Sequence, residues 1–256
     1  MSMATECGRT SITKRHLVTT VGVLTNFGGA SMLDGDQRRV TFLDRVPSHR
    51  RSDLVSRGRP ARFASRQVLF QQGEPGNHVY LLRTGRVKVV RIEPDGRTTL
   101  LAVRVGGDLI GETSVLDGRD RSATVTALAP VTAHRFGADE FHRAMEECRL
   151  APDLMRYVTG RLRESDELRA EMAVLPVRAR LARTLIRLTN SCGSVRGDEV
   201  WIEVSQDDLA QAVGASRNMI VKELTHLRGE ALVRTGRRLV VLRDLPRLHR
   251  IATDRA

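Results

Sequence analysis

The stretch GGDLIGETSVLDGRDRSATVTA, residues 106–127, carries the densest chemical signal in this chain. Within it the pair Gly111–Glu112 precedes a short loop, and Arg121–Ser122 opens a strand of alternating apolar residues. Glu112 can accept hydrogen bonds from a sugar hydroxyl, and Arg121 offers a planar fork of donors for phosphate oxygens. Ser122 and nearby backbone N–H groups can complete an anion-binding nest, and Gly111 lets the backbone approach a ligand closely. The stretch therefore predicts a site for a ligand with a sugar hydroxyl and a phosphate.

A second signal lies further along the chain, in SQDDLAQAVGASRNMIVKELTHL, residues 205–227. Gly214 suits a tight turn between two helices, and apolar residues at helical spacing give the second helix a buried face. This pattern is typical of a helix-turn-helix, a module that binds double-stranded DNA. We expect four residues on its exposed face to meet the duplex: Ser216, Arg217, Asn218 and Lys222.

The charge of the chain is uneven. The 256 residues carry a net charge of +12. Residues 61–175 hold 17 basic and 16 acidic side chains, whereas residues 176–256 hold 15 and 9, a balance of +6. A basic domain around a helix-turn-helix is the electrostatic pattern of duplex binding. The alternative is that arginine is simply the default surface cation here, because the chain has only three lysines.

Several classes of protein are excluded by what the sequence lacks. Cys7, Cys148 and Cys192 form neither a metal-binding spacing nor a disulfide framework, which indicates a reducing cytoplasm. No window holds eighteen consecutive apolar residues, so we expect no transmembrane span. No Ser-His-Asp set, Walker loop or metal cluster is present, and we expect a protein that is not an enzyme.

The segment between the two signals has a regular order of short strands and then helices. Short apolar runs separated by glycine turns predict an antiparallel jelly roll, and they cover 68–70, 79–82, 87–92, 99–103, 123–127 and 131–136. Residues 138–148 are predicted to be helical, and a long helix is predicted from Pro152 to Leu175. A helix over 177–190 and a hairpin over 231–242 complete a winged helix-turn-helix. The fold class is therefore α+β.

Four regions follow from this order. They are a weakly ordered extension over 1–38, within which Met32 is a second possible start, a β-roll over 39–150, a dimerisation helix over 151–176 and a winged helix-turn-helix over 177–250. Along the long helix, residues alternate by four and three, as in a coiled-coil seam: Leu154, Val158, Arg161, Ser165, Leu168, Met172 and Leu175. This seam predicts a homodimer. The alternative is a single amphipathic helix packed on its own domain.

Together these residues resemble the catabolite-activator/FNR (Crp-Fnr) family of bacterial regulators, over roughly residues 40–245. The motifs that carry the resemblance are GDLIGE followed by RSA, and Val213-Gly-Ala-Ser-Arg217 in the second signal. The resemblance implies a cyclic nucleotide, usually cAMP, as an allosteric effector. By resemblance Gly111 and Glu112 hold the ribose and Arg121 and Ser122 hold the cyclic phosphate. The purine is expected to meet Ser165 and Asp166 on the long helix.

Two residues depart from the family pattern. Thr113 replaces the usual apolar residue after Gly111–Glu112, and Asp166 replaces a small hydroxyl residue. A β-roll that binds no nucleotide, or that senses another small effector, is therefore the alternative reading. Cys7 alone does not make an iron–sulfur site, and His78 lies in a turn where a solvated histidine is expected rather than a haem ligand. We expect no metal, haem or iron–sulfur cluster.

The resemblance also extends to DNA reading. Arg217 is expected to contact guanine through its bidentate fork, and Asn218, where many relatives have Glu, suits adenine. Lys222 can reach a base or a phosphate, and Ser216 either contacts a phosphate or caps its helix. A two-fold dimer implies a palindromic operator. RNA polymerase is a further partner implied by the family.

Overall fold

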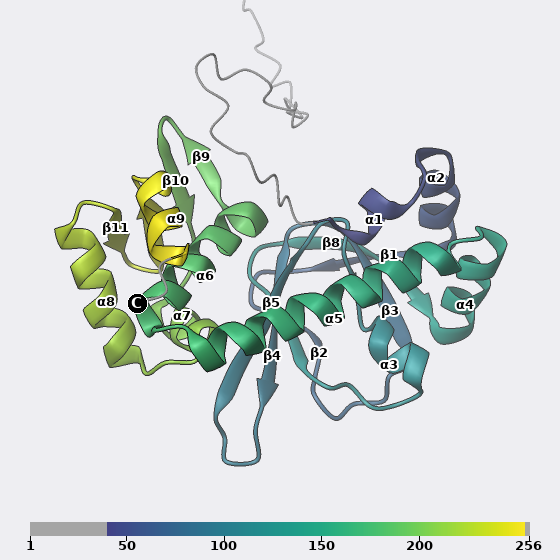
Figure 1. Cartoon of the computed structure of the whole chain (residues 1–256). Coiled ribbons are helices and arrows are strands. Elements are labelled where there is room, and N and C mark those ends of the chain that lie inside the picture. Colours follow the sequence, from purple (N-terminus) through teal and green to yellow (C-terminus); the bar gives the residue numbers. More distant parts are fainter. Residues whose placement is uncertain (1–39, 254–256) are drawn as a thin grey trace, which may run out of the picture. The chain divides into compact units, whose positions relative to one another are not determined.

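The computed structural model describes residues 40–253, and for Cys192 only the backbone (Figure 1). The predicted extension over residues 1–38 lies outside the described residues. The described chain begins with two short helices, α1 (Phe42–Arg45) and α2 (Ser48–Arg57). Thr41 starts α1 as its N-cap, because its hydroxyl accepts the N–H of Asp44 at 3.3 Å while the Asp44 carboxylate accepts the N–H of Thr41 at 2.9 Å.

Two four-stranded antiparallel sheets form a β-roll, as the sequence predicted. One sheet has the order β1-β8-β3-β6, with bounds Arg59–Phe63, Val131–Gly137, His78–Thr84 and Leu109–Ile110. The other has the order β2-β7-β4-β5, with bounds Val68–Phe70, Thr124–Ala127, Arg86–Ile92 and Thr98–Val105.

Strand β3 explains why this part of the sequence reads as a continuous apolar run. Alternate side chains of a strand point to opposite faces of its sheet. Tyr80 and Leu82 belong to one buried cluster, with residues of β2, β4 and β7 from the other sheet. Val79 and Leu81 belong to a second cluster that includes residues of α1, α4 (Ala138–Glu147) and α5 (Ala151–Val174). Both faces of β3 are therefore buried, and no polar alternation is expected.

Three helices complete this half of the molecule: α3 (Glu112–Asp117), α4 (Ala138–Glu147) and α5 (Ala151–Val174). Helix α5 runs for 24 residues and is the long helix of Figure 1. Proline stands in its first turn, where a missing N–H costs no hydrogen bond, as the sequence predicted. Pro176 follows directly after Leu175, which caps the end of α5.

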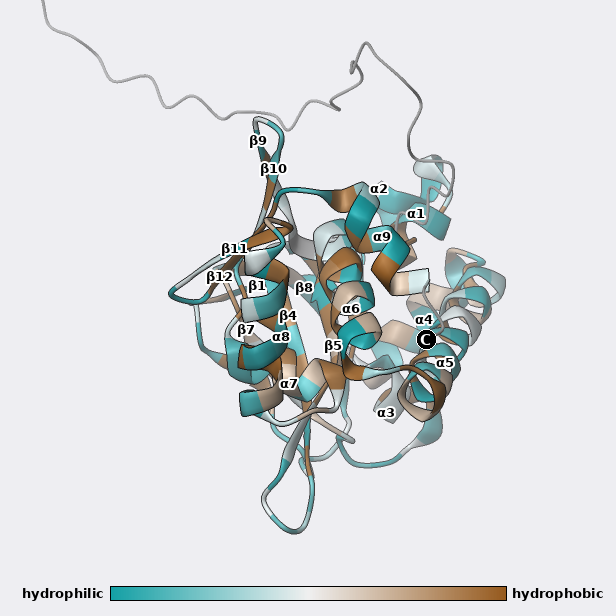
Figure 2. Ribbon diagram, turned by 60° about the vertical axis from the view of Figure 1, so that its left-hand side comes forward, coloured by the Kyte–Doolittle hydropathy of each residue, from teal (hydrophilic) through white to brown (hydrophobic). Residues whose placement is uncertain are grey.

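The C-terminal half is a winged helix-turn-helix around one buried apolar cluster. Helix α6 (Val177–Cys192) packs against it, and Figure 2 shows α6 in alternating teal and brown, as expected for an amphipathic helix. A third antiparallel sheet has the order β11-β12-β10-β9, with bounds Val233–Gly236, Leu239–Leu242, Glu199–Ile202 and Ser194–Arg196. Helices α7 (Gln206–Val213), α8 (Arg217–Gly229) and α9 (Leu245–Thr253) complete it.

The differences from the predicted elements are local. The segment after Gly111, predicted to be a loop, is helix α3. Strands β1, β6 and β9 and helix α9 were not predicted; each strand has five residues or fewer, too few to establish a period of two. Within residues 40–253, no helix combines the length and the apolar composition that a membrane span requires.

Candidate functional site

Gly111 is the turn on which the first candidate site is built. Its φ is +80°, in the left-handed region, and it caps the N-terminus of α3. A Cβ at this position would lie 2.6 Å from Nη1 of Arg121 and 2.6 Å from the Phe70 ring. Glycine is therefore required both for the backbone conformation and for the close approach of Arg121.

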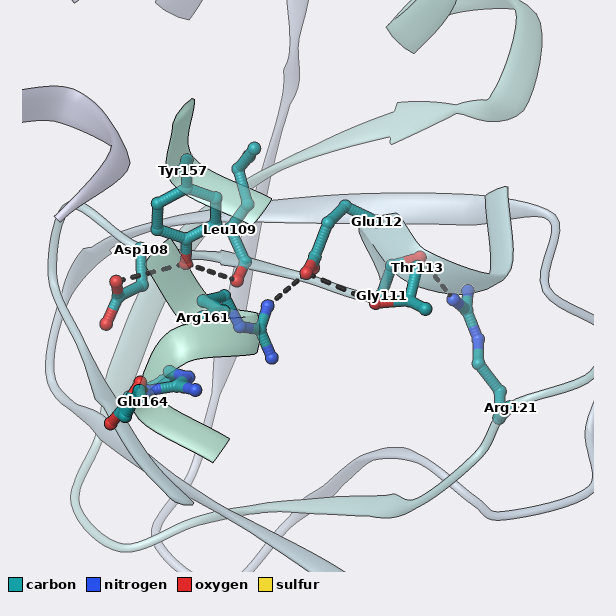
Figure 3. Close-up of polar contacts among 10 residues, drawn as sticks. Asp108, Leu109, Gly111, Glu112, Thr113, Arg121, Tyr157, Arg161 and Glu164 are labelled. Atoms are coloured by element: carbon teal, nitrogen blue, oxygen red, sulfur yellow. Dashed lines mark hydrogen bonds and ion pairs between the residues drawn. The ribbon is translucent and has the colours of Figure 1, made fainter. Parts of the chain in front are cut away.

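Glu112 follows as the first residue of α3 and is almost completely buried, with 1% of its surface exposed. A buried carboxylate needs compensation for its lost hydration. Arg161 of α5 supplies it through an ion pair from Nη1 to Oε1 of Glu112, and the hydroxyl of Thr113 lies 3.4 Å from the same oxygen (Figure 3). The sequence placed Arg161 in a dimer seam and missed this contact, because the two residues lie 49 positions apart.

Arg121 is buried as well, with 4% of its surface exposed. Its Nη1 donates to the carbonyl oxygen of Gly111 at 2.8 Å and its Nη2 to that of His78 at 2.6 Å. The guanidinium carbon lies 3.8 Å from the centroid of the Phe70 ring. Its Nε is buried and has no hydrogen-bond partner among the described residues. Burial lowers the pKa of Arg121, so this buried cation favours a nearby negative charge.

The other predicted ligand residues are placed differently. Ser122 is exposed and follows directly after Arg121. Ser165 is half-buried on α5, whereas Asp166 is exposed and pairs with Arg169 at 3.2 Å. The structure thus brings Gly111, Glu112 and Arg121 together, and it shows no contact of Ser165 or Asp166 with them.

Three further contacts fix α5 against the β-roll beside this site. The buried hydroxyl of Tyr157 lies 3.1 Å from Oδ1 of Asp108 and 3.2 Å from the carbonyl oxygen of Leu109 (Figure 3). Burial and the charge of Asp108 hold the pKa of Tyr157 well above its ordinary value. Arg104 of β5 pairs with Glu164 of α5 at 3.1 Å. The position of α5, and with it that of Arg161, is therefore coupled to the site.

The predicted dimer seam needs a correction at its first residue. Leu154 is 7% exposed and packs in the cluster of its own β-roll, so it does not lie on a free face. The large exposed apolar residues in this part of α5 are Met155 and Leu162, with exposed fractions of 67% and 58%. They lie seven residues apart and thus on one face. The β-roll covers the face that carries Leu154 and Tyr157, whereas the predicted seam residue Met172, further along α5, is 40% exposed.

Helix α8 forms the second candidate site. Gly214 ends α7 with a φ of +65° and makes the turn between the two helices. Ser216 is the N-cap of α8, because its hydroxyl accepts the N–H of Met219 at 3.2 Å. Arg217, Asn218 and Lys222 are all exposed. The capping role of Ser216, one of the two readings of the sequence, is thus confirmed.

Two features of this helix were not expected from the sequence. Nε of Arg217 forms an ion pair with Oδ1 of Asp207 at 3.2 Å, and both side chains are exposed. Val221 is 39% exposed and stands four residues after Arg217, on the same side of the helix. An exposed apolar residue beside two cations suits contact with a thymine methyl group.

Within the part of the chain that the structure describes, no three His, Cys, Asp or Glu side chains are grouped so that they could hold a metal ion.

Both halves of the chain are similar to known proteins. The model of the cyclic nucleotide-binding domain family matches residues 60–148, and that of the Crp-like helix-turn-helix domain matches residues 179–251. The transcriptional regulator LdrP of Thermus thermophilus is 33% identical over 192 residues, which cover 75% of this chain and 95% of LdrP. The CRP-like cAMP-activated global transcriptional regulator of Mycobacterium tuberculosis is 29% identical over 202 residues, covering 78% and 90%.

The fold of this chain is also similar to a solved structure. A transcriptional regulator of the CRP family from Thermus thermophilus, TTHB099, superposes with a TM-score of 0.67 at 28% sequence identity. The superposition covers 76% of this chain and 97% of that chain.

Proposed function

The chain belongs to the Crp family of transcriptional regulators, and we propose that it is a homodimer whose DNA binding is controlled by a cyclic nucleotide, with cAMP as the first candidate. Its relatives are regulators and not enzymes, so its role is DNA binding rather than catalysis. The observation that carries the proposal is a buried carboxylate and a buried guanidinium held on the two sides of Gly111.

The residues at this site fit such a ligand. The Nε of Arg121 is a buried donor without a partner among the described residues, and a phosphate oxygen would provide one. Ser122 is exposed beside it and can donate its hydroxyl to the same phosphate. Glu112 retains an oxygen that can accept from a ribose hydroxyl while Arg161 holds the other. Ser165 and Asp166 on α5 are our candidates for contact with the base.

In this proposal, helix α5 couples ligand binding in the β-roll to DNA binding. Arg161 binds Glu112 from this helix, and α5 leads directly through Pro176 into the winged helix-turn-helix. A ligand that competes for Glu112 changes the contact that holds α5 on the β-roll. The exposed pair Met155 and Leu162 supports a second copy of the chain as the partner of α5.

The DNA partner would be a palindromic duplex in the cytoplasm, read by Arg217, Asn218 and Lys222 of two α8 helices. We propose RNA polymerase as a further partner, as the family resemblance implies.

Calorimetry with cAMP and with cGMP tests the ligand. We expect Arg121→Lys, which keeps the charge but loses the fork, and Ser122→Ala to weaken binding by roughly tenfold or more, since each removes a hydrogen bond to a charged group. Arg143→Ala, an exposed arginine of α4, serves as the matched control. Absence of binding to wild type, or wild-type affinity in both Ser122→Ala and Arg121→Lys, would favour the alternative in which the β-roll binds no nucleotide or senses another effector.

Sedimentation tests the dimer. Leu162→Glu places a charge on the exposed apolar face of α5 and is expected to shift wild-type dimers towards monomers and to weaken binding to a palindromic duplex. Glu167→Gln, an exposed change on the same helix, is the control. A wild type that is monomeric at micromolar concentration contradicts the proposal.

A further inference from the structure

A cleft of about 620 Å³ lies between the β-roll and the winged helix-turn-helix, away from Gly111 and Arg121. We call it the basic cleft. Its lining comes from β4, β7 and the turn before β2 on one wall, and from β9, β10 and the β11–β12 turn on the other. Six lining side chains are cations, namely Arg66, Arg86, Lys88, Arg196, Arg237 and Arg238, whereas Glu203 is the one carboxylate among the lining residues.

Two ion pairs connect the walls and leave most of this charge uncompensated. Lys88 contacts Oδ1 of Asp208 at 2.9 Å, and Arg86 contacts Glu203 at 3.5 Å. Arg66, Arg196 and Arg237 form no salt bridge with another residue of the described range 40–253. Like charges that converge in a narrow cleft repel each other, and the field that they create concentrates anions there.

The backbone at the cleft has an unusual feature. Arg66 and Arg238 have φ values of +69° and +56°, in the left-handed region that favours glycine. Only four residues other than glycine have a positive φ in the described part of the chain, and two of them line this cleft. A residue other than glycine costs of order 1 kcal/mol in this conformation, so the cleft carries an arginine at two positions where the backbone favours glycine.

Trp201 adds a planar surface to the cleft. The guanidinium carbon of Arg196 lies 4.6 Å from the centroid of the Trp201 ring, and that of Arg234 lies 5.6 Å from it. The indole ring is half-buried, and Arg196, which is exposed, lies over it in the lining of the cleft. Guanidinium groups with fixed orientation are well suited to bidentate contacts with phosphate oxygens.

We propose that the basic cleft binds a small molecule with a chain of two or more phosphates, as a second effector site separate from that of Gly111 and Arg121. A single phosphate engages one or two of these cations, whereas a chain spans both walls. The chain is either an inorganic polyphosphate or part of a nucleoside di- or triphosphate. Because its walls belong to the β-roll and to the wing, the bound anion stabilises this arrangement of the two.

Trp201 is the only tryptophan of the chain, so its fluorescence reports on the cleft directly. The full-length protein is titrated with tripolyphosphate, ATP, AMP and inorganic phosphate at physiological salt, with calorimetry in parallel. We expect saturable binding of tripolyphosphate or ATP at least tenfold tighter than that of AMP or phosphate. Tighter binding of ATP than of tripolyphosphate identifies a nucleotide as the ligand, and equal binding identifies the phosphate chain alone.

Variants on the two walls locate the site. Arg66→Ala and Arg237→Ala, both at exposed positions, should each weaken binding about tenfold or more. Arg149→Ala is the matched control, because Arg149 is also an exposed arginine with a positive φ, of +52°, but lies between α4 and α5. Arg121→Lys should bind tripolyphosphate as wild type does, which separates this site from the proposed nucleotide site.

Three results would overturn the proposal. They are the absence of saturable binding of both polyphosphates, equal affinity for AMP and ATP, and unchanged affinity in both wall variants. If a palindromic duplex changes Trp201 fluorescence and the wall variants weaken only duplex binding, the cleft serves the DNA backbone and the proposal is wrong.

Discussion

The site around Gly111 and the exposed face of α8 use charge in opposite ways. Glu112 and Arg121 are 1% and 4% exposed, and the chain itself provides partners for both. The side chain of Arg217 is 64% exposed and meets only an exposed carboxylate. A buried charge contributes to the fold before any ligand binds, whereas an exposed one is held ready for a partner at little cost to stability.

This difference predicts that substitutions in the two regions change different properties of the protein. Substitutions around Glu112 should alter the free energy of unfolding together with ligand affinity. Substitutions on α8 should alter DNA binding alone. Four measurements test the separation, in order of decreasing expected effect.

Arg161→Ala should have the largest effect. It leaves the carboxylate of Glu112 buried without its cation, and removal of one partner from a buried pair costs about 3 kcal/mol of stability. Chemical denaturation measures this loss. Adding Glu112→Gln to the variant should recover much of the stability, because the unpaired charge is then absent. A loss below about 1 kcal/mol would show that the pair is solvated and would remove the contrast with α8.

Arg217→Ala should leave stability unchanged and weaken binding to the preferred duplex by about 1–3 kcal/mol, with relaxed preference at one guanine. Selection from randomised duplexes and denaturation of the same variant provide the two readouts. Asn218→Glu, measured alongside it, should move the preference at one position towards cytosine, because a carboxylate accepts from the cytosine amino group. A consensus that both variants leave unchanged would show that α8 does not read bases in this way.

The pH dependence of stability probes the buried region again. His78, whose carbonyl oxygen accepts from Arg121, has its pKa lowered to about 4 by burial and by the nearby charges of Arg135 and Arg121. As the pH falls from about 6.5 to about 4, the unfolded chain takes up the proton first, so stability is lost across this window. His78→Gln should reduce that loss by about 1 kcal/mol after solvent screening of the half-buried ring. His142→Gln, at an exposed position, should not.

Asp207→Asn should have the smallest effect. Removing the carboxylate that holds Nε of Arg217 frees its rotation and removes a negative charge from the DNA face. We expect binding to a scrambled duplex to strengthen and the ratio of preferred to scrambled affinity to fall, each by less than about 1 kcal/mol. Electrophoretic titrations with both duplexes measure the ratio. An increased ratio would contradict a positioning role for Asp207.

The contrast between the buried site and the exposed helix also explains which features could be predicted from the sequence. Strands such as Val68–Phe70 and the helices α7 and α8 were predicted because local period and turn residues determine them. The exposed residues of α8 were also found, since one helix presents them. The partner of Glu112 was missed, because Arg161 lies on a different element and only tertiary packing brings the two together.

The dimer seam illustrates a second reason why the sequence alone does not determine all contacts. A repeat of four and three identifies an apolar face on α5 but not what covers it. Leu154 fits the repeat and is buried in its own β-roll, whereas Met155, one position later, is exposed. Similarly, the cations of the basic cleft come from six separate positions between Arg66 and Arg238, a spacing that no local pattern records.

The contact between Lys88 and Asp208 gives the protein a built-in chemical reporter. Lys88 and Lys222 are the only lysines of the described residues. Lys222 is exposed on α8, whereas the amine of Lys88 is held in its ion pair and its side chain is 28% exposed. Within residues 40–253, an amine-selective reagent followed by mass spectrometry therefore labels the exposed face of α8 and the junction with the β-roll at one residue each. The ratio of the two labels follows the opening of that junction without any engineered probe.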